Sequence, residues 1–316
     1  MAKRTTIEWC DHTLNMWTGC SRVSRACKRC YAADISRRFK RGEWGKRGAR
    51  WFPSEKYWRG PLAWNREARR QAKRHRVFCA SMGDVFEGRA DLNPQRARLW
   101  LLIVATPHLD WLLLTKRPEN VLDMVPQAWL ENWPPNVWVG TTIEDQKCAD
   151  QRLPRLLSIP AAVRFVSCEP LVSPINLAPY LGEGLGKINW VIAGGESGNG
   201  SEPSDPAWFR DLRDQCVKAA VAFFFKQWGN WAPDKKSRVP ATVVPPSIST
   251  KRHLAIVGQP MAGKRRQPIM SEPMKRFRSK KQAGRKLDGR TWDQFPLVCL
   301  PKGWPPHQRS VTKRAA

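Results

Sequence analysis

The middle of the chain repeats one pattern: a short apolar run ends in small or polar residues, and a segment with helical character usually follows. Continuous rather than alternating apolar runs are typical of strands buried on both faces, as in a parallel sheet covered by helices. The pattern therefore predicts an α/β fold, either a β/α barrel or a doubly wound sheet. Its six runs begin at Val77, Trp111, Val137, Val163, Ile188 and Val221.

Four segments between these runs are expected to be helical, and one more strand is expected before the first clustered cysteine. In the first helix, Asn93 is a candidate N-cap and Pro94 occupies the first helical position, where its missing N–H leaves no hydrogen bond unmade. The expected helices span residues 94–106, 117–131, 145–158 and 206–219.

The predicted strands all end in chemically useful residues. The endings read SMGD, TKR, GTT, SCEP, GGESG and KQWG. In barrels and doubly wound sheets alike, the site lies at the carboxyl ends of the strands. Any single ending can be explained by residues that commonly terminate strands, but together they predict a shared pocket.

The formal net charge of +28 is concentrated at the two ends of the 316-residue chain. Lys and Arg outnumber Asp and Glu by 21 to 6 in residues 1–76 and by 20 to 4 in residues 234–316, whereas residues 77–233 have 14 against 17. Cations that neutralise phosphates release condensed counterions, so basic ends on a near-neutral body favour a nucleic acid as partner. The alternative is a merely solubilising surface.

The composition changes near Pro233, where proline, serine, threonine and basic clusters become frequent. We expect a body of residues 1–232 with a basic N-terminal insertion, and a basic, loosely structured and partly disordered extension over residues 233–316. Residues 258–265 nearly fit a phosphate-binding loop, but Arg265 replaces the magnesium-binding hydroxyl, so nucleotide hydrolysis is not expected. Without an eighteen-residue apolar run or a secretory signal, we expect no membrane partner and a cytoplasmic location.

Three of the nine cysteines are clustered: Cys20, Cys27 and Cys30 have the spacing C-x6-C-x2-C. In a reducing compartment this favours a metal over a disulfide framework. Zinc would need a fourth ligand, which Cys10 or His12 can supply. An iron–sulfur cubane on three thiolates would leave one iron open for a substrate or cofactor. The residues alone leave both metals open.

Around these cysteines the chain resembles the radical S-adenosylmethionine (SAM) superfamily, specifically its phage-associated branch. The stretches that carry the resemblance begin with TIEW, TGC and CKRCYA, continue through the strand endings above, and finish with GRKLDGRTW. They cover residues 6–231 and, as a closing segment, 280–296. The resemblance implies a partial β/α barrel of the radical SAM type. One departure is the first cysteine gap, which is six residues here and three in most of the superfamily.

The resemblance also implies the cofactors and the reaction. The three cysteines would hold a [4Fe-4S] cluster, SAM would chelate its fourth iron, and an external donor such as flavodoxin or ferredoxin would reduce it. Cleavage of SAM would yield a 5′-deoxyadenosyl radical that abstracts hydrogen from the substrate. With the basic ends, this predicts modification or repair of a nucleic-acid base, in DNA first and RNA second, in the host cytoplasm if the protein is phage-encoded. A zinc-stabilised, non-catalytic DNA-binding protein and a radical SAM enzyme acting on a small molecule or peptide remain alternatives.

The order of the strands indicates which part of the site each candidate residue would form. If the first strand precedes the cysteines, SMGD ends the second, and Asp84 is the expected acceptor for the amino group of SAM. Cys168 is a candidate hydrogen donor to a product radical, and otherwise a small core residue. The candidate SAM-binding residues are Ser81, Met82, Gly83, Asp84, Thr115, Lys116, Thr141, Thr142, Glu144, Gly194 and Gly195. The candidate catalytic residues are Cys168, Glu169, Glu196 and Lys226.

Overall fold

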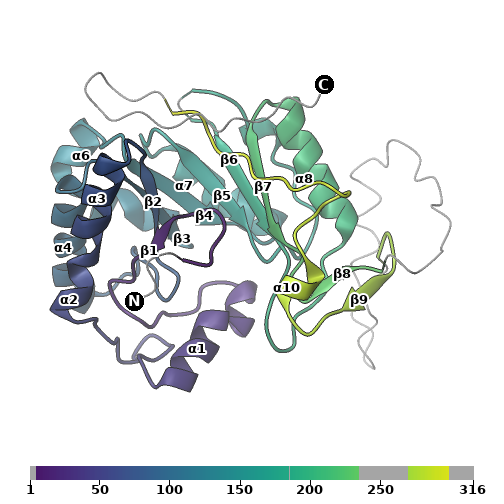
Figure 1. The fold of residues 1–316 in the computed structure, drawn as a ribbon, viewed down its shortest axis with the longest axis horizontal. Helices are drawn as coiled ribbons and strands as arrows, with labels where there is room; N and C mark the ends of the chain where they lie inside the picture. The colour runs from purple at the N-terminus through teal and green to yellow at the C-terminus, as the bar shows by residue number, and fades with distance from the viewer. Residues whose placement is uncertain (1–4, 185, 235–269, 299–316) are drawn as a thin grey trace.

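Seven parallel strands form the centre of the molecule, and their spatial order follows the order of the chain. The computed structural model describes residues 5–184, 186–234 and 270–298 (Figure 1). The sheet curls into a half barrel, and its strand order never reverses as that of a doubly wound sheet does. The strands are β1 (His12–Thr13), β2 (His75–Cys79), β3 (Leu109–Thr115), β4 (Val137–Thr142), β5 (Arg164–Cys168), β6 (Trp190–Gly194) and β7 (Ala222–Gln227). The predicted parallel α/β class and the strand before the cysteines are confirmed.

Helices follow most of these strands and cover the outer face of the sheet (Figure 1). The α-helices are α1 (Tyr31–Phe39), α2 (Glu55–Trp58), α3 (Gly60–Arg70), α4 (Asn93–Val104), α5 (Val121–Met124), α6 (Gln127–Glu131), α7 (Gln146–Leu157), α8 (Pro206–Lys218) and α10 (Lys280–Ala283). Short 3-10 helices are η1 (Arg25–Arg29), η2 (Ala90–Leu92), η3 (Pro118–Asn120) and η4 (Ala178–Tyr180). No helix within the described ranges has both the length and the apolar character needed to cross a membrane.

Two helix predictions are wrong in detail. Asn93 is not an N-cap, because η2 runs directly into α4 and places Asn93 inside the helix, with Leu92 at the cap position. The helix expected over residues 117–131 is instead η3, α5 and α6, since Pro126 interrupts it. The other two expected helices, at 145–158 and 206–219, correspond to α7 and α8 within two residues.

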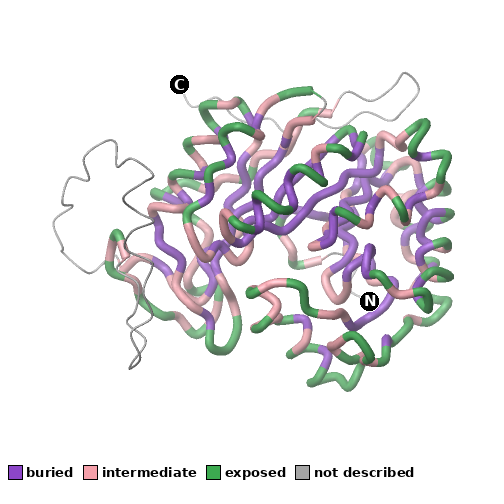
Figure 2. Tube along the Cα trace, turned by 180° about the vertical axis from the view of Figure 1, so that it is seen from behind, coloured by how far each residue is buried: buried purple, intermediate pink, exposed green. Residues whose placement is uncertain are grey.

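Alternate strand residues pack into two different cores. Trp138, Phe165 and Trp190 belong to an aromatic cluster on the concave face, whereas their neighbours Val139 and Val166 belong to the larger core under the helices. Both sets are buried, and Figure 2 shows the burial along the central strands. The continuous apolar runs in the sequence therefore arise because the sheet is covered on both faces.

Close packing inside the half barrel leaves no room for a side chain at Gly140 of β4. A Cβ there would lie 2.4 Å from the ring of Phe165 on β5. We expect Gly140→Ala to lower the free energy of unfolding by about 1–3 kcal/mol, because the aromatic cluster must shift. Urea denaturation measures this, with Gly88→Ala, whose Cβ would have 3.8 Å of clearance, as the matched control. Equal stability of both variants would mean that Phe165 can move freely.

The C-terminal segment completes the sheet edge. β8 (Trp231–Pro233) and β9 (Met274–Arg276) form a separate antiparallel pair, and the chain then runs back beside β7, where the N–H of Phe225 donates to Trp292. This covers an otherwise open edge. The predicted extension spans residues 233–316, of which 233–234 and 270–298 are described, and the longer of these two parts is packed against the half barrel. The stretch 258–265 that resembles a phosphate loop lies outside the described residues.

Candidate functional site

A cavity lies at the carboxyl ends of the strands, between the sheet and the loop that carries the clustered cysteines. Trp9, Phe78 and Leu114 from the concave face form its apolar floor. Polar side chains from the strand ends form its walls, and all three clustered thiols line it. The predicted site residues that it brings together are Cys20, Cys27, Cys30, Ser81, Gly83, Asp84, Thr115, Lys116, Thr142, Glu169, Gly195, Glu196 and Lys226.

The remaining predicted residues do not line this cavity: Met82, Thr141, Glu144, Cys168 and Gly194. Cys168 is fully buried in the core under the helices, beside Cys216 of α8, and burial raises the pKa of its thiol well above the ordinary value. Glu144 forms a buried 2.8 Å ion pair with Arg152 of α7. Thr141, Cys168 and Gly194 lie on strands, and each is next to a residue that does line the cavity. Because both faces of the sheet are buried, the sequence pattern carried no signal to separate such neighbours.

Asp84 connects the ends of β2 and β3. Its Oδ1 accepts hydrogen bonds from the hydroxyl of Thr115 at 2.6 Å and the N–H of Phe86 at 3.0 Å. Its Oδ2 accepts from the N–H of Lys116 at 3.0 Å and from Nη1 of Arg117 at 2.8 Å. Protein donors thus occupy both oxygens, and the carboxylate holds two strand ends in register at the cavity wall.

Arg117 links this carboxylate to the cysteine loop. Its Nη2 donates to the carbonyl and hydroxyl oxygens of Ser21 at 2.9 and 2.8 Å, and its Nη1 lies 3.9 Å from Sγ of Cys20. The prediction from the strand ending TKR included Thr115 and Lys116 but missed Arg117. Its position directly after them was the available signal.

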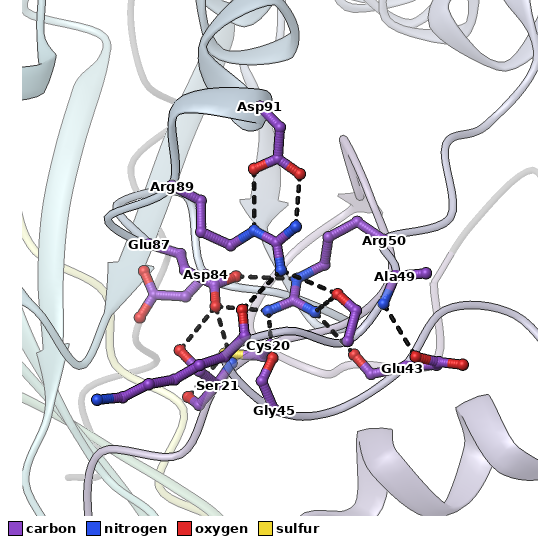
Figure 3. A network of polar contacts seen from close by, with 12 residues as sticks. Cys20, Ser21, Glu43, Gly45, Ala49, Arg50, Asp84, Glu87, Arg89 and Asp91 are labelled. Atoms are coloured by element: carbon purple, nitrogen blue, oxygen red, sulfur yellow. Dashed lines mark hydrogen bonds and ion pairs between the residues drawn. The ribbon is translucent and has the colours of Figure 1, made fainter.

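A second buried ion pair anchors the same loop. Glu87 accepts from the N–H and hydroxyl of Ser21 at 2.9 and 2.7 Å, and it pairs with Arg50 at 2.7 Å (Figure 3). The side chains of Arg50 and Glu87 are 0% and 2% exposed. Arg50 also donates to the carbonyls of Glu43, Gly45 and Gly48. The residue after Cys20 is therefore held from two sides, and neither Arg50 nor Glu87 was a predicted site residue.

The thiols differ in their electrostatic surroundings. Burial and the nearby Asp84 carboxylate raise the pKa of Cys20 to about 12, although Arg117 opposes this. Burial also opposes ionisation of Cys27, but Lys116 and hydrogen bonds at Val23 and Ser24 outweigh it, so the pKa of Cys27 is lowered. A bound metal supplies positive charge of its own and deprotonates coordinating thiols.

The donor set fits a metal centre held by three thiolates. The described lining contains no fourth cysteine and no histidine. Cys10 donates instead to the carbonyl of Ile7 at 3.8 Å, and the ring of His12 is stacked on Trp64 at 4.3 Å. The two residues considered as a fourth zinc ligand are therefore engaged elsewhere. Within the described chain, no three His, Cys, Asp or Glu side chains are already arranged as a metal-ligand group.

Charged pairs form the far side of the cavity. Nζ of Lys226 on β7 lies 2.8 Å from both carboxylate oxygens of Glu169, which follows β5. Arg29 reaches across from η1 to Glu202 at 2.8 Å and Glu196 at 3.4 Å. The cysteine loop and the loop after β6 are thus bridged across the mouth, a contact that sequence reasoning missed.

Fold and site together define a class: a parallel β/α half barrel with a polar cavity, lined by three cysteines, at the carboxyl ends of its strands. The chain belongs to the family described as "Protein of unknown function (DUF5131)", whose sequence pattern matches residues 4–296. Searches of curated proteins and of solved structures found no significant match. The family match extends beyond the half barrel and reaches the segment that runs back beside β7.

Proposed function

We propose that this protein is a radical SAM enzyme. Cys20, Cys27 and Cys30 would hold a [4Fe-4S] cluster, which when bound and reduced supplies the electron that cleaves SAM to a 5′-deoxyadenosyl radical. The observation that carries the proposal is that the three thiols line one cavity at the carboxyl ends of half-barrel strands. The likeness of the sequence motifs to the superfamily supports it.

The residues of the cavity suggest how SAM would be held. Lys116 offers an ammonium group for the methionine carboxylate, and Ser81 and Gly83 follow the neighbouring strand β2, where the amino group would bind. Thr142 offers a hydroxyl for the ribose. The role of Asp84 would be to position these groups, since its oxygens already accept four hydrogen bonds.

The opposite wall would receive the substrate. Lys226 and Glu169 neutralise each other across 2.8 Å, and both side chains are mostly buried, so a polar substrate group beside the pair would meet a hydrogen-bond donor and an acceptor with no net charge between them. The aromatic floor of Trp9 and Phe78 would exclude water, which protects a reactive intermediate from side reactions.

A nucleic-acid base is the proposed substrate, in DNA first and RNA second. The two basic ends of the chain support this, because they surround a body with a slight excess of acidic residues. A base within a duplex would have to leave the stack to reach a cavity below the strand ends. A small molecule or peptide remains the alternative substrate.

The test is anaerobic purification and reconstitution, followed by metal analysis and visible spectroscopy with and without dithionite and SAM. We expect about four irons and four sulfides per chain and a colour that bleaches on reduction. Chromatography should detect 5′-deoxyadenosine, formed faster in the presence of nucleic acid. A colourless protein with one zinc after reconstitution would favour the zinc-stabilised DNA-binding protein. SAM cleavage that no nucleic acid stimulates would favour the small-molecule or peptide alternative.

A further inference from the structure

A second hollow adjoins the mouth of the cavity. Ser197, in the loop after β6, lines both. The second hollow has a volume of about 700 Å³ and runs from that loop to the start of α10. We call it the β9 groove. Its lining residues are Ser197, Gly198, Asn199, Asn230, Arg276, Phe277, Arg278, Ser279 and Lys280, which include three cations and no carboxylate.

The positive charge of the β9 groove is not neutralised. Arg276, Arg278 and Lys280 are exposed, and none of them has a carboxylate within ion-pair distance in the described part of the chain. Two acidic residues of this segment, Glu272 and Asp288, are already paired with arginines of α8. Residues 235–269 contain no Asp or Glu, so they supply no side-chain carboxylate that could pair with these three cations.

The backbone of the groove is preorganised. Asn230 joins its three segments: its carbonyl accepts from the N–H of Phe277 at 2.7 Å, and its side-chain oxygen accepts from the N–H of Gly198 at 2.9 Å. The β8–β9 pair fixes the chain on one side, and Ser279 caps α10 on the other. A ligand that binds here therefore meets charges held on an ordered frame, which lowers the entropy lost on binding.

We propose that the β9 groove binds the phosphate backbone of the nucleic acid whose base enters the adjoining cavity. Three unpaired cations along an open hollow suit a polyanion, and the half-buried ring of Phe277 lies among them where a neighbouring base can stack. The shared wall at Ser197 lets one molecule occupy both hollows. The link between the two rests on the proposed function, whereas backbone binding does not require the cluster.

The test compares two triple variants that remove the same charge. One is Arg276→Gln with Arg278→Gln and Lys280→Gln. The control is Lys147→Gln with Arg155→Gln and Lys218→Gln, exposed cations of α7 and α8 that lie outside both basic ends of the chain and line neither hollow. Fluorescence anisotropy with a labelled 20-nucleotide single strand measures Kd between 50 and 200 mM KCl, and duplex DNA and RNA of the same sequence are tested beside it.

We expect the groove variant to bind at least about tenfold more weakly and to reduce the slope of log K against log salt by about 2–3, while the control changes Kd less than about twofold. The charge-retaining set Arg276→Lys, Arg278→Lys and Lys280→Arg should restore most of the affinity. Equal weakening by both triple variants, or wild-type binding by the groove variant, would overturn the proposal.

The same proteins separate this proposal from the proposed function. Groove-dependent binding without 5′-deoxyadenosine formation would support the groove and contradict the radical enzyme. Cluster loading and SAM cleavage by a protein that binds none of the three polynucleotides would support the radical enzyme and contradict the groove. Each triple variant is first checked for wild-type thermal stability, which we expect because all six side chains are exposed.

Discussion

Replacing Cys27 by alanine is expected to abolish cluster loading. With one of three ligands gone, the iron content after anaerobic reconstitution should fall from about four per chain to below about one. The reduced protein should then form no 5′-deoxyadenosine from SAM. Iron and sulfide assays, the visible spectrum and chromatography of the reaction measure this. Cys20→Ala and Cys30→Ala should behave in the same way, because all three thiols line one cavity.

The matched control is Cys148→Ala. Cys148 lies on α7, is nearly buried and does not line the cavity, so its loss should leave the iron content unchanged. Cys10→Ala separates the two metals, since a zinc site with Cys10 as fourth ligand would lose metal and an iron–sulfur cluster on the other three would not. Four irons per chain in Cys27→Ala would refute the three-cysteine assignment.

The second large effect is expected from Asp84→Asn. The change leaves the guanidinium of Arg117 buried without its counter-ion and turns an amide N–H toward backbone or hydroxyl donors. Breaking a buried pair in this way costs about 3–5 kcal/mol of unfolding free energy. Urea denaturation of the metal-free protein measures it. The cysteine loop should also loosen, because Arg117 holds Ser21.

The comparison for this prediction is Asp91→Asn. Asp91 also pairs with an arginine, Arg89, at 2.5 Å, but its side chain is 52% exposed, so we expect a loss of no more than about 1 kcal/mol. A stable Asp84→Asn protein that loads iron normally and binds SAM poorly would contradict the positioning role. It would instead support the expectation from the sequence, in which Asp84 receives the amino group of SAM directly.

The strands and the position of the site could be predicted because both depend on local sequence. The run beginning at Val137 predicts β4, and the polar residues that follow each run mark the carboxyl ends where the cavity lies. The three cysteines are close in sequence, so the short stretches of chain between them are enough to keep them in one part of the molecule. Because the strands are buried on both faces, their apolar runs are continuous, and this local pattern predicts a parallel sheet without knowledge of any long-range contact.

The contacts that organise the site could not be predicted in this way. Arg50, Glu87 and Arg117 come from separate segments: Glu87 and Arg117 both bind Ser21, and Arg50 joins them through its ion pair with Glu87. Nothing in the local sequence of Arg50 and Glu87 distinguishes them from the many other charged residues of this basic chain, and Arg117 had only its position at a predicted strand ending as a signal. For the same reason, the mouth contact of Arg29 with Glu196 and Glu202 was not foreseen.

The sequence by itself determined the parallel α/β class, the edge of the sheet that holds the cavity and the cysteine loop, because apolar periodicity and short spacings are local properties. Only the tertiary structure decided which residue of each strand end faces the cavity, as Thr142 does and Cys168 does not. It also decided which charges are paired and buried and which, as in the β9 groove, remain open to a ligand. These depend on the curl of the sheet and on contacts between residues far apart in the chain, which no local pattern encodes.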